Sequence, residues 1–579
     1  MNVNILRTAI FTLYAFCANL GISQIMSLPI QASIEKRVYM STSGNDSNVG
    51  DSLNPVASFT QALTRLNQLS NAQTGDVYSE VVLFEGTYSQ ALSQAYSMYQ
   101  IGSKKLNVSV RGRGVVQLDG LPVSNISSGG GMIHLLGSRI SVRNIEVLYS
   151  PANGVRFGYD YNGIEVNSHD IIVKDVVVSS TLGHGILVGK GALNTINPLS
   201  ITAMAERFLV ENCEVKNAVN YNIPQAQWGS AIKAWNAKHV NIRNCRVHDN
   251  SGEGIDFDYC DSVAVYGNTL KDNYANIYFD KVTNGWMYNN FIENELKQSP
   301  GILCAIEAFT GLILNYSIGN VSIFNNVLLN TQGLHFWQGN YGANQHGYFQ
   351  NIAISHNTII GHQTGSGSCL HFNYLTFLGQ PVPNVSFQNI HVSRNIISAP
   401  NDSLNNGQLC ISSLSPQVGL TASNNLYNST QVPWYNATTD VVNNQLPNFA
   451  ASLAEVTPSL TNPLFVSTAP ISTILFDHLF LPRLQPNTNL GALEFDQGNA
   501  GIFPLISFDK QLYPNPSSGE INLPKELAAT WVNVLNKSGQ LVMKMEVGTD
   551  SKLSLNELPN DTYFLQTSKQ VYRLVLMNP

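Results

Sequence analysis

Short stretches in which apolar and polar residues alternate recur along most of the chain, each followed by an asparagine and another apolar residue. The recurring asparagine stands at Asn144, Asn212, Asn244, Asn268, Asn290, Asn326, Asn357 and Asn395, and Asp175 is a variant of it. Three successive members, Asn244, Asn268 and Asn290, are 24 and 22 residues apart. Alternation with a period of two predicts β-strands, and repetition at this spacing predicts strands stacked coil upon coil.

A coil of about 22 residues has room for three short strands joined by tight turns, and longer coils would carry loop insertions. Asn suits such a turn because it tolerates a left-handed backbone, and its side-chain amide can bond to the Asn of the next coil. Cys213 and Cys245 each follow their Asn directly, so we expect them at equivalent inward positions of adjacent coils. An amphipathic helix from about Ser58 to Leu69 would cover the open strand edge of the first coil.

These features resemble the right-handed parallel β-helix of pectate lyases, polygalacturonases and chondroitinase-type enzymes. The opening segment 38–88 and the closing segment 462–494 resemble the two ends of secreted proteins of this kind. The resemblance implies an all-β solenoid. We predict an N-terminal helical cap with the first strands over residues 24–100 and the β-helix over residues 101–496.

Beyond the β-helix, turn residues every 8–12 positions separate short strands, which is typical of a small β-sandwich. The segments YPNP at 513–516, SGQLV at 538–542 and LPNDTYFL at 558–565 resemble the type A C-terminal sorting domain of type IX secretion substrates in the Bacteroidota. The resemblance implies that residues 508–579, after a linker at 497–507, are read by the type IX secretion machinery. An ordinary sandwich appended for binding is the alternative.

The N-terminus has the features of a signal peptide over residues 1–23. Arg7 supplies a positive charge, residues 9–20 form an apolar stretch, and residues 21–23 offer a small-residue cleavage site. The apolar stretch is too short to span a bilayer, and no later segment of the sequence is long and apolar enough to do so. We therefore expect an exported chain, secreted or at the cell surface, without a membrane span.

Composition narrows the range of partners. Only 12% of the 579 residues are charged, 44% are hydrophobic, and 31 Lys and Arg stand against 38 Asp and Glu, for a net charge of −7. An acidic chain without basic runs is not suited to binding nucleic acid by neutralising phosphates. We expect a monomer. The six cysteines that remain after cleavage match no zinc spacing, which predicts buried free thiols.

In such solenoids, the strand that follows the glycine-rich turn of each coil commonly carries the functional site. Seven segments of the sequence align as this strand: 185–188, 231–235, 254–258, 276–280, 305–309, 333–337 and 369–373. Alternation then points two columns of side chains outward. The first contains Leu187, Lys233, Asp256, Tyr278, Glu307, His335 and His371, and the second contains Gly189, Trp235, Asp258, Asp280, Phe309, Trp337 and Asn373. Acids beside aromatic rings suit sugars, whose C–H faces stack while their hydroxyls seek polar partners.

The spacing of the acids favours acid–base chemistry. Alternate residues of a strand are about 6.7 Å apart and neighbouring coils about 4.8 Å apart. Asp256 and Asp258 would therefore have the separation of an inverting glycosidase, and Asp258 and Asp280 that of a retaining one. Acids this close cannot all ionise freely, so they share a proton or hold a cation. An elimination would instead need a base, such as Lys233, and usually Ca²⁺ beside a uronate carboxylate.

The segments 229–233 and 250–256 resemble the paired coils of family 9 polysaccharide lyases. The Asp-Asp-Gly-x-Asp calcium motif of that family appears here as Gly-Glu-Gly-Ile-Asp, with one acid missing and another lengthened. The resemblance implies a calcium ion and a catalytic lysine. The residues it assigns are Glu253 and Asp256 to the ion, and Lys233 or Lys281 to the base.

The sequence thus predicts a secreted protein that cleaves an extracellular polysaccharide, as a lyase or a glycoside hydrolase. The predicted catalytic residues are Lys233, Asp256, Asp258, Asp280 and Glu307, and the predicted substrate-binding residues are Trp235, Tyr278, His335, Trp337 and His371. Two structural alternatives stay open: Lys233 and Asp256 as a simple cross-strand ion pair, and the histidines as a stacked ladder. The protein would then be a non-catalytic glycan-binding or surface adhesion β-helix.

Overall fold

The structure is a computed structural model of the whole chain. It describes residues 28–70, 77–89, 97–98, 106–120, 131–135, 137–150, 153–157, 169–189, 205–219, 229–297, 299–306, 315–338, 346–361, 370–372, 385–398, 411–413, 419–427, 441–442, 520–523, 531–535, 541–558, 562–566 and 571–575. The predicted signal peptide lies outside these residues. Contacts divide the chain into two units, residues 1–447 and residues 448–579.

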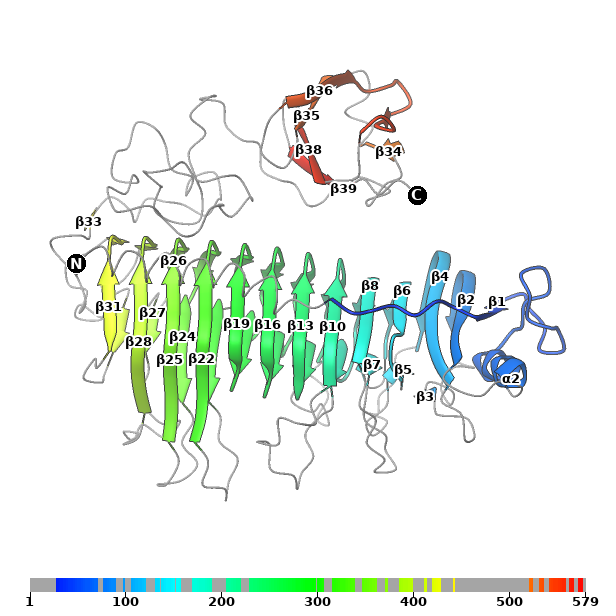
Figure 1. Cartoon of the computed structure of the whole chain (residues 1–579), viewed down its shortest axis with the longest axis horizontal. Coiled ribbons are helices and arrows are strands. Elements are labelled where there is room, and N and C mark those ends of the chain that lie inside the picture. Colours follow the sequence, from blue (N-terminus) through cyan, green and yellow to red (C-terminus); the bar gives the residue numbers. More distant parts are fainter. Residues whose placement is uncertain are drawn as a thin grey trace, which may run out of the picture. The chain divides into compact units, whose positions relative to one another are not determined.

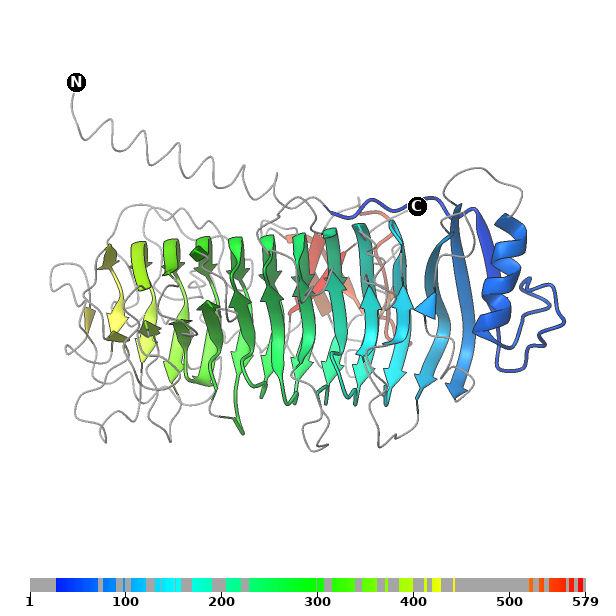
Figure 2. The same cartoon turned by 90° about the horizontal axis from the view of Figure 1, so that it is seen from below.

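The first unit is a stack of coils whose strands form two long parallel sheets (Figures 1 and 2). The 11-stranded sheet contains β3 (Ser97–Met98), β5 (Gly131–Leu135), β7 (Asn153–Phe157), β9 (Ile186–Gly189), β12 (Ser230–Trp235), β15 (Glu253–Asp258), β18 (Ile277–Asp280), β21 (Ile302–Ile306), β24 (Leu334–Gln338), β27 (Leu370–Phe372) and β30 (Ile411–Ser413).

The 22-stranded sheet takes the strands of the other faces of the coils. It contains β1 (Lys36–Met40), β2 (Val77–Ser89), β4 (Leu106–Asp119), β6 (Ser141–Leu148), β8 (His169–Ser179), β10 (Ala205–Glu211), β11 (Glu214–Lys216), β13 (Ala237–Arg243), β14 (Arg246–His248), β16 (Asp261–Tyr266), β17 (Thr269–Lys271), β19 (Thr283–Tyr288), β20 (Phe291–Glu293), β22 (Asn315–Phe324), β23 (Val327–Thr331), β25 (His346–Ser355), β26 (Thr358–Gly361), β28 (Val385–Ser393), β29 (Ile396–Ser398), β31 (Leu420–Ser423), β32 (Leu426–Tyr427) and β33 (Val441–Val442). The predicted right-handed parallel β-helix is confirmed.

The predicted cap is also present. Helix α2 (Phe59–Ser70) lies at the β1 end of the stack (Figure 1). It begins after Ser58, whose hydroxyl accepts the backbone N–H of Gln61 at 3.2 Å and so satisfies an otherwise unpaired donor of the first turn. Ala62 and Leu66 are fully buried in the same apolar core as the first strands. No helix among the described residues is long and apolar enough to cross a membrane.

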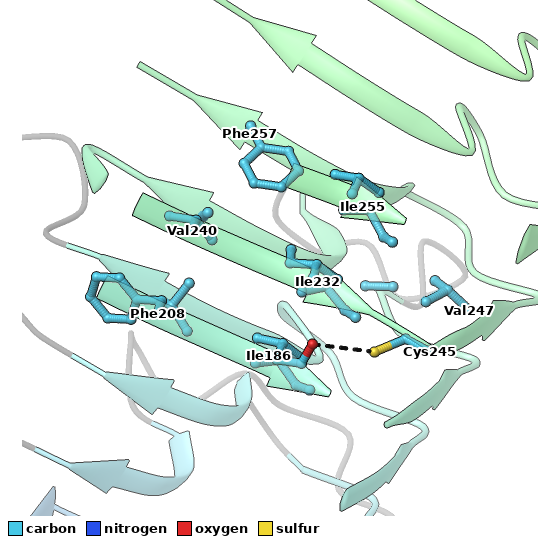
Figure 3. Close-up of a cluster of buried hydrophobic side chains, with 14 of the residues drawn as sticks. Ile186, Phe208, Ile232, Val240, Cys245, Val247, Ile255 and Phe257 are labelled. Carbon is cyan, nitrogen blue, oxygen red and sulfur yellow. Dashed lines mark hydrogen bonds between the residues drawn. The ribbon is translucent and has the colours of Figure 1, made fainter. Parts of the chain in front are cut away.

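Inward side chains of successive coils stack into apolar columns. Ile186, Ile232 and Ile255 form one such column, and Figure 3 shows how they pack against Phe208 and Val240 from the opposite sheet. Stacking like on like lets each coil bury its apolar face against the next, which no coil could do alone.

The recurring asparagine is divided between two adjacent positions. One position is a turn with a left-handed backbone, occupied by Asn144, Asp175, Asn212, Asn244, Gly267, Asn289, Asn325, His356 and Arg394, with φ between 53° and 65°. The next position points inward and carries a buried amide ladder of Asn268, Asn290, Asn326, Asn357, Asn395 and Asn425. Each amide donates to the side-chain oxygen of the next at 2.9–3.0 Å.

The two cysteines sit in the column of this ladder, at equivalent inward positions as predicted, because β10 pairs with β13 in that register. Cys213 and Cys245 are both buried and free. The thiol of Cys245 donates to the carbonyl of Val210 (Figure 3), and its backbone N–H donates to Asn268 Oδ1 at 2.9 Å. The ladder therefore continues into the earlier coils as thiols.

The segment before β1 is anchored to the β-helix by Asp170. The carboxylate of Asp170 accepts Arg207 Nε at 2.6 Å, Arg207 Nη2 at 2.9 Å and the backbone N–H of Ile30 at 3.0 Å, and it contacts His169 Nδ1 at 2.7 Å. Burial alone would raise the pKa of Asp170, but these contacts outweigh it and bring the pKa to about 2. The ionised form is therefore the stable one in the folded protein.

We expect Asp170→Asn to lower the free energy of unfolding by about 2 kcal/mol at pH 6, since the folded pKa lies below the ordinary value of 3.8. The contribution is complete above pH 3.8 and disappears as pH falls through 2. Urea unfolding at pH 6, 4 and 2.5 measures it. A difference between the two proteins that is independent of pH would contradict this assignment.

The second unit contains antiparallel strands. β36 (Leu541–Glu546), β35 (Trp531–Leu535), β38 (Thr562–Gln566) and β39 (Val571–Val575) form one sheet in that order, and β34 (Glu520–Asn522) pairs with β37 (Lys552–Ser554). A separate apolar core of Val532, Val534, Leu553, Leu565 and Leu574 lies between them. The predicted small sandwich is present. The predicted boundaries at 496 and 507 fall outside the described residues.

Candidate functional site

The predicted outward columns form where β12, β15 and β18 pair. Lys233 lies beside Asp256 and Asp256 beside Tyr278, while Trp235, Asp258 and Asp280 form the second column. Neighbouring members are thus one strand apart, about 4.8 Å, and members of the two columns on one strand are about 6.7 Å apart.

The predicted register is wrong one coil further on. Ile302 pairs with Ile277, and Ala305 pairs with Asp280, so β21 is four residues earlier than expected. Leu303 and Ala305 occupy the outward positions that were assigned to Glu307 and Phe309, both of which lie outside the described residues. The prediction failed because alternation fits two registers of this apolar segment, one with Ile302 and one with Ile306 beside Ile277.

The preceding glycine decides between the two registers. Gly185, Gly254, Gly301 and Gly333 each precede the first inward residue of their strand. A Cβ atom at Gly301 would lie 2.7 Å from Leu328 Cδ2 and 3.0 Å from Thr331 Oγ1, so a side chain there would require these neighbours to shift. Aligning the glycines would have given the correct register from the sequence.

The acids and lysines of these strands meet in one cluster, which we call the lysine–carboxylate cluster: Lys233, Glu253, Asp256, Asp258, Asp280 and Lys281. Lys233 Nζ lies 2.7 Å from Asp256 Oδ2 and 3.7 Å from Asp258 Oδ2. Lys281 Nζ lies 3.6 Å from Asp258 Oδ1 and contacts Asp280 Oδ2. Two ammonium groups thus face four carboxyl groups.

The carboxyl groups of the cluster are buried although they point away from the apolar core. Asp256 is 1% exposed, Asp280 3% and Asp258 7%. Asp256 Oδ1, Asp258 Oδ1 and Trp235 Nε1 have no hydrogen-bond partner among the described residues. Buried polar atoms of this kind are costly unless a ligand or water pairs with them. Half-buried Lys233 and Trp235 form the more accessible side of the cluster.

The surroundings of Lys233 and Asp256 raise the pKa of both groups, for different reasons. Burial lowers the pKa of Lys233, but the carboxylates of Asp256 and Asp258 outweigh this and raise it above its usual range. Burial raises the pKa of Asp256, Asp258 raises it further, and the contacts with Lys233 and Ser230 offset only part of the change. Lys233 therefore holds its proton at neutral pH, and Asp256 retains a proton more readily than a free carboxyl.

Two residues that the sequence did not assign belong to this site. Ser230 Oγ lies 2.7 Å from Asp256 Oδ2, and the Lys281 ammonium lies 4.2 Å from the ring centre of Tyr259. Tyr259 and Lys281 each follow their strand at a left-handed position, with φ of 53° and 56°. This turn brings the Lys281 ammonium beside Asp258 and Asp280 and over the Tyr259 ring, and the equivalent position after β12 is Asn236. The sequence did contain a sign of Tyr259 and Lys281, because each directly follows the second outward residue of its strand.

The predicted histidine and tryptophan subsite lies further along the same sheet, with β21 between β18 of the cluster and β24. The rings of His335 and His371 are 4.9 Å apart, edge to face, and His335 Nε2 donates to the carbonyl of Gln332 at 2.7 Å. Burial lowers the pKa of His371. Trp337 lies one strand from Ala305 and is half-buried.

The two predicted calcium ligands come together around one hydroxyl, since Ser230 Oγ lies 3.3 Å from Glu253 Oε2 as well as 2.7 Å from Asp256 Oδ2. In the part of the chain that the structure describes, no group of three or more His, Cys, Asp or Glu side chains is placed to hold a metal ion. The calcium site stays a prediction.

Comparison with known protein families identifies the C-terminal segment. Residues 511–575 match the family described as a secretion system C-terminal sorting domain. The tail is a type IX secretion sorting domain. The protein is therefore secreted or held at the cell surface. Residues 123–302 match the family described as periplasmic copper-binding protein (NosD), within the β-helix. No curated protein sequence matches the chain.

The chain is similar to several solved structures. The structure of XylC with xylose superposes with a TM-score of 0.46 at 10% identity, covering 79% of this chain and 98% of that one. Pectate lyase Pel9A gives 0.40 at 14% identity, covering 80% and 97%. PfbA, a surface adhesin of Streptococcus pneumoniae, gives 0.36 at 13% identity, covering 64% and 87%.

Proposed function

We propose that this secreted β-helix protein hydrolyses an extracellular polysaccharide at the lysine–carboxylate cluster. One observation carries the proposal: the pairing of β12, β15 and β18 gathers Lys233, Asp256, Asp258 and Asp280 on the outward side of one sheet. Asp256 and Asp258 each keep one buried oxygen without a hydrogen-bond partner among the described residues. A bound sugar could supply the missing partners.

The geometry favours hydrolysis over elimination. A lysine base must first lose its proton, whereas Lys233 is paired with Asp256 and Asp258, which hold the proton on it. A pair of carboxyl groups on one strand, about 6.7 Å apart, leaves room for a water molecule between acid and base, as inverting glycosidases require. Asp280 is paired with Lys281, which also lies 3.6 Å from Asp258 Oδ1.

The proposed roles follow from this pair. Asp256 gives its proton to the glycosidic oxygen, which keeps the electron pair of the breaking bond to the anomeric carbon. A water molecule adds to that carbon and gives one proton to Asp258. Exchange with solvent then returns a proton to Asp256 and removes one from Asp258. Trp235, next to Asp258 in the second column, offers an aromatic face for a sugar ring.

We expect new reducing ends, an inverted anomeric product and no ultraviolet-absorbing unsaturated sugar when the full chain is screened against neutral and uronate-containing glycans. The screen is run with and without a chelator. Unsaturated products would show a lyase, with Lys233 or Lys281 as the base. Binding without either product would favour the alternative, a glycan-binding surface protein. Loss of turnover in chelator, restored by Ca²⁺, would support the predicted calcium site.

The match to the copper-binding family does not favour a second function. In its described part, Cys213, Cys245 and Cys260 are buried, and each thiol donates to backbone carbonyls of the solenoid interior. Copper sites need several soft or imidazole ligands that converge on one point. The outward cluster offers carboxylates and ammonium groups instead.

A further inference from the structure

The outer surface of the 22-stranded sheet has a charged part and an uncharged part. On β8, β10 and β13, outward side chains form ion pairs across the strands, as Lys174 and Arg243 do with Glu211 at 2.8 and 2.7 Å. By contrast, β19, β22, β25, β28 and β31 contain no Asp, Glu, Lys or Arg. We call the outward side of these five strands the neutral face. Its two central columns contain Trp286, Ser322, Ala353, His391 and Thr421, and Tyr288, Phe324, Ser355, Ser393 and Ser423.

An exposed row of amides runs along the neutral face. Asn320 donates to Asn284 and Asn351 donates to Asn320, both at 3.0 Å, and Asn389 donates to Asn351 at 2.7 Å. The side chains of Asn320, Asn351 and Asn389 are all exposed, so a ligand in solution can reach them. Each of these three amides spends one of its two N–H groups within the row, and the second is left to donate to a ligand.

The regular spacing of these groups suits a ligand that itself repeats. Members of one column follow each other at the distance between neighbouring strands, about 4.8 Å. A row of identical donors at a constant spacing therefore favours a polymer over a small molecule. Without fixed charges, the neutral face cannot offset the cost of desolvating an ionic polymer, whereas amides and hydroxyls pair well with the hydroxyl groups of a neutral sugar.

Aromatic side chains border the neutral face where the charged part begins. Three rings stack nearly parallel, with centres 4.7 and 5.0 Å apart: Tyr266, Tyr288 and Phe324. Trp286 is half-buried in the adjacent column, where its neighbours on β16 and β22 are Ala264 and Ser322. Because both neighbours are small, the adjacent strands leave room beside the indole ring. The C–H face of a sugar ring stacks well on such a ring.

We infer that the neutral face is a second glycan-binding site, on which a neutral polysaccharide lies across the strands, along the axis of the solenoid, with one sugar ring on Trp286. This site is on the 22-stranded sheet, whereas the lysine–carboxylate cluster is on the 11-stranded sheet. The inference takes from the proposed function only that the partner is a polysaccharide. It goes beyond that function, because binding at the neutral face requires no hydrolysis.

The test is depletion of the full chain from solution by microcrystalline cellulose, chitin and insoluble mannan. We expect the wild-type protein to bind at least one of them, and Trp286→Ala to bind it about 10-fold more weakly. Asn351→Gly, which suits a backbone with φ of 56°, should weaken binding about five-fold. Tyr274→Ala and Asn217→Gly are the matched controls: Tyr274 is 53% exposed, Asn217 is exposed with φ of 50°, and both lie outside the neutral face.

Further variants separate binding from folding and from hydrolysis. Trp286→Phe keeps an aromatic ring and should restore most of the binding, and Asp258→Asn should bind like the wild type. The inference is overturned if the wild-type protein binds no neutral glycan, or if Trp286→Ala binds fully while Asp258→Asn does not. A dimer that Trp286→Ala dissociates, with no glycan bound, would instead make the face an interface between two copies. Binding that depends on Trp286 without hydrolysis would uphold the inference and contradict only the proposed function.

Discussion

Asp258→Asn should lower kcat by at least about 100-fold on any polysaccharide that the wild-type protein cleaves, with a much smaller effect on KM. Asp258 is the proposed base, and an amide cannot take a proton from water. It is also the acid that both lysines approach, Lys233 at 3.7 Å and Lys281 at 3.6 Å. Initial rates from reducing ends, measured over a series of substrate concentrations, separate kcat from KM.

Asp261→Asn is the matched control for this prediction. Asp261 lies on β16 of the other sheet, and its carboxylate accepts the hydroxyl of Thr283 and the amide of Asn284, both at 2.6 Å. It carries the same charge and also takes part in polar contacts, but it is not in the cluster. Equal losses in the two variants would mean that the loss reflects folding. Full turnover in Asp258→Asn would remove Asp258 from the site.

Asn326→Ala should lower the free energy of unfolding of the β-helix by about 3 kcal/mol, because it removes the middle of the buried ladder. Asn326 Nδ2 donates to the carbonyl of Met287 at 2.9 Å and to Asn357 Oδ1 at 3.0 Å. Its Oδ1 accepts both the backbone N–H and the side-chain amide of Asn290, at 3.1 and 2.9 Å. Alanine leaves these buried groups without their partner. Urea unfolding followed by circular dichroism measures the loss.

The exposed asparagine ladder supplies the control. Asn320 donates to Asn284 Oδ1 and accepts from Asn351, both at 3.0 Å, in a second ladder at the surface. Asn320 has φ of 56°, so glycine is the substitution that avoids backbone strain. Because water replaces the lost partners, Asn320→Gly should cost no more than about 1 kcal/mol. Equal losses at both sites would show that burial of the inner ladder does not determine its contribution.

The sequence predicted the solenoid because its signal is repeated. A period of two and a recurring Asn identified the coils, and alternation alone placed Lys233, Asp256 and Asp258 on one outward side of the paired strands. The same alternation could not fix the register of β21, since Ile302 and Ile306 both fit an inward position. For this reason Glu307 was predicted at the outward position that Leu303 occupies.

Other features of the site depend on three-dimensional contacts, which the pattern of residues along the sequence does not show. Ser230 is one serine among many until β12 and β15 lie side by side and its hydroxyl reaches Asp256. Burial of the acids was likewise not predicted, because outward alternation says nothing of what surrounds a side chain. The separation of the left-handed turn from the amide ladder also required coordinates, since Asn289 and Asn290 are adjacent and identical.

A crystal structure of the full chain carrying Asp258→Asn, soaked with an oligosaccharide that the wild-type protein cleaves, tests the central claim most directly. We predict a sugar ring against Trp235 with its glycosidic oxygen within hydrogen-bond distance of the Asp256 carboxyl group. A ligand bound only on the 22-stranded sheet, or only at His335 and Trp337 without reaching Asp256, would contradict it.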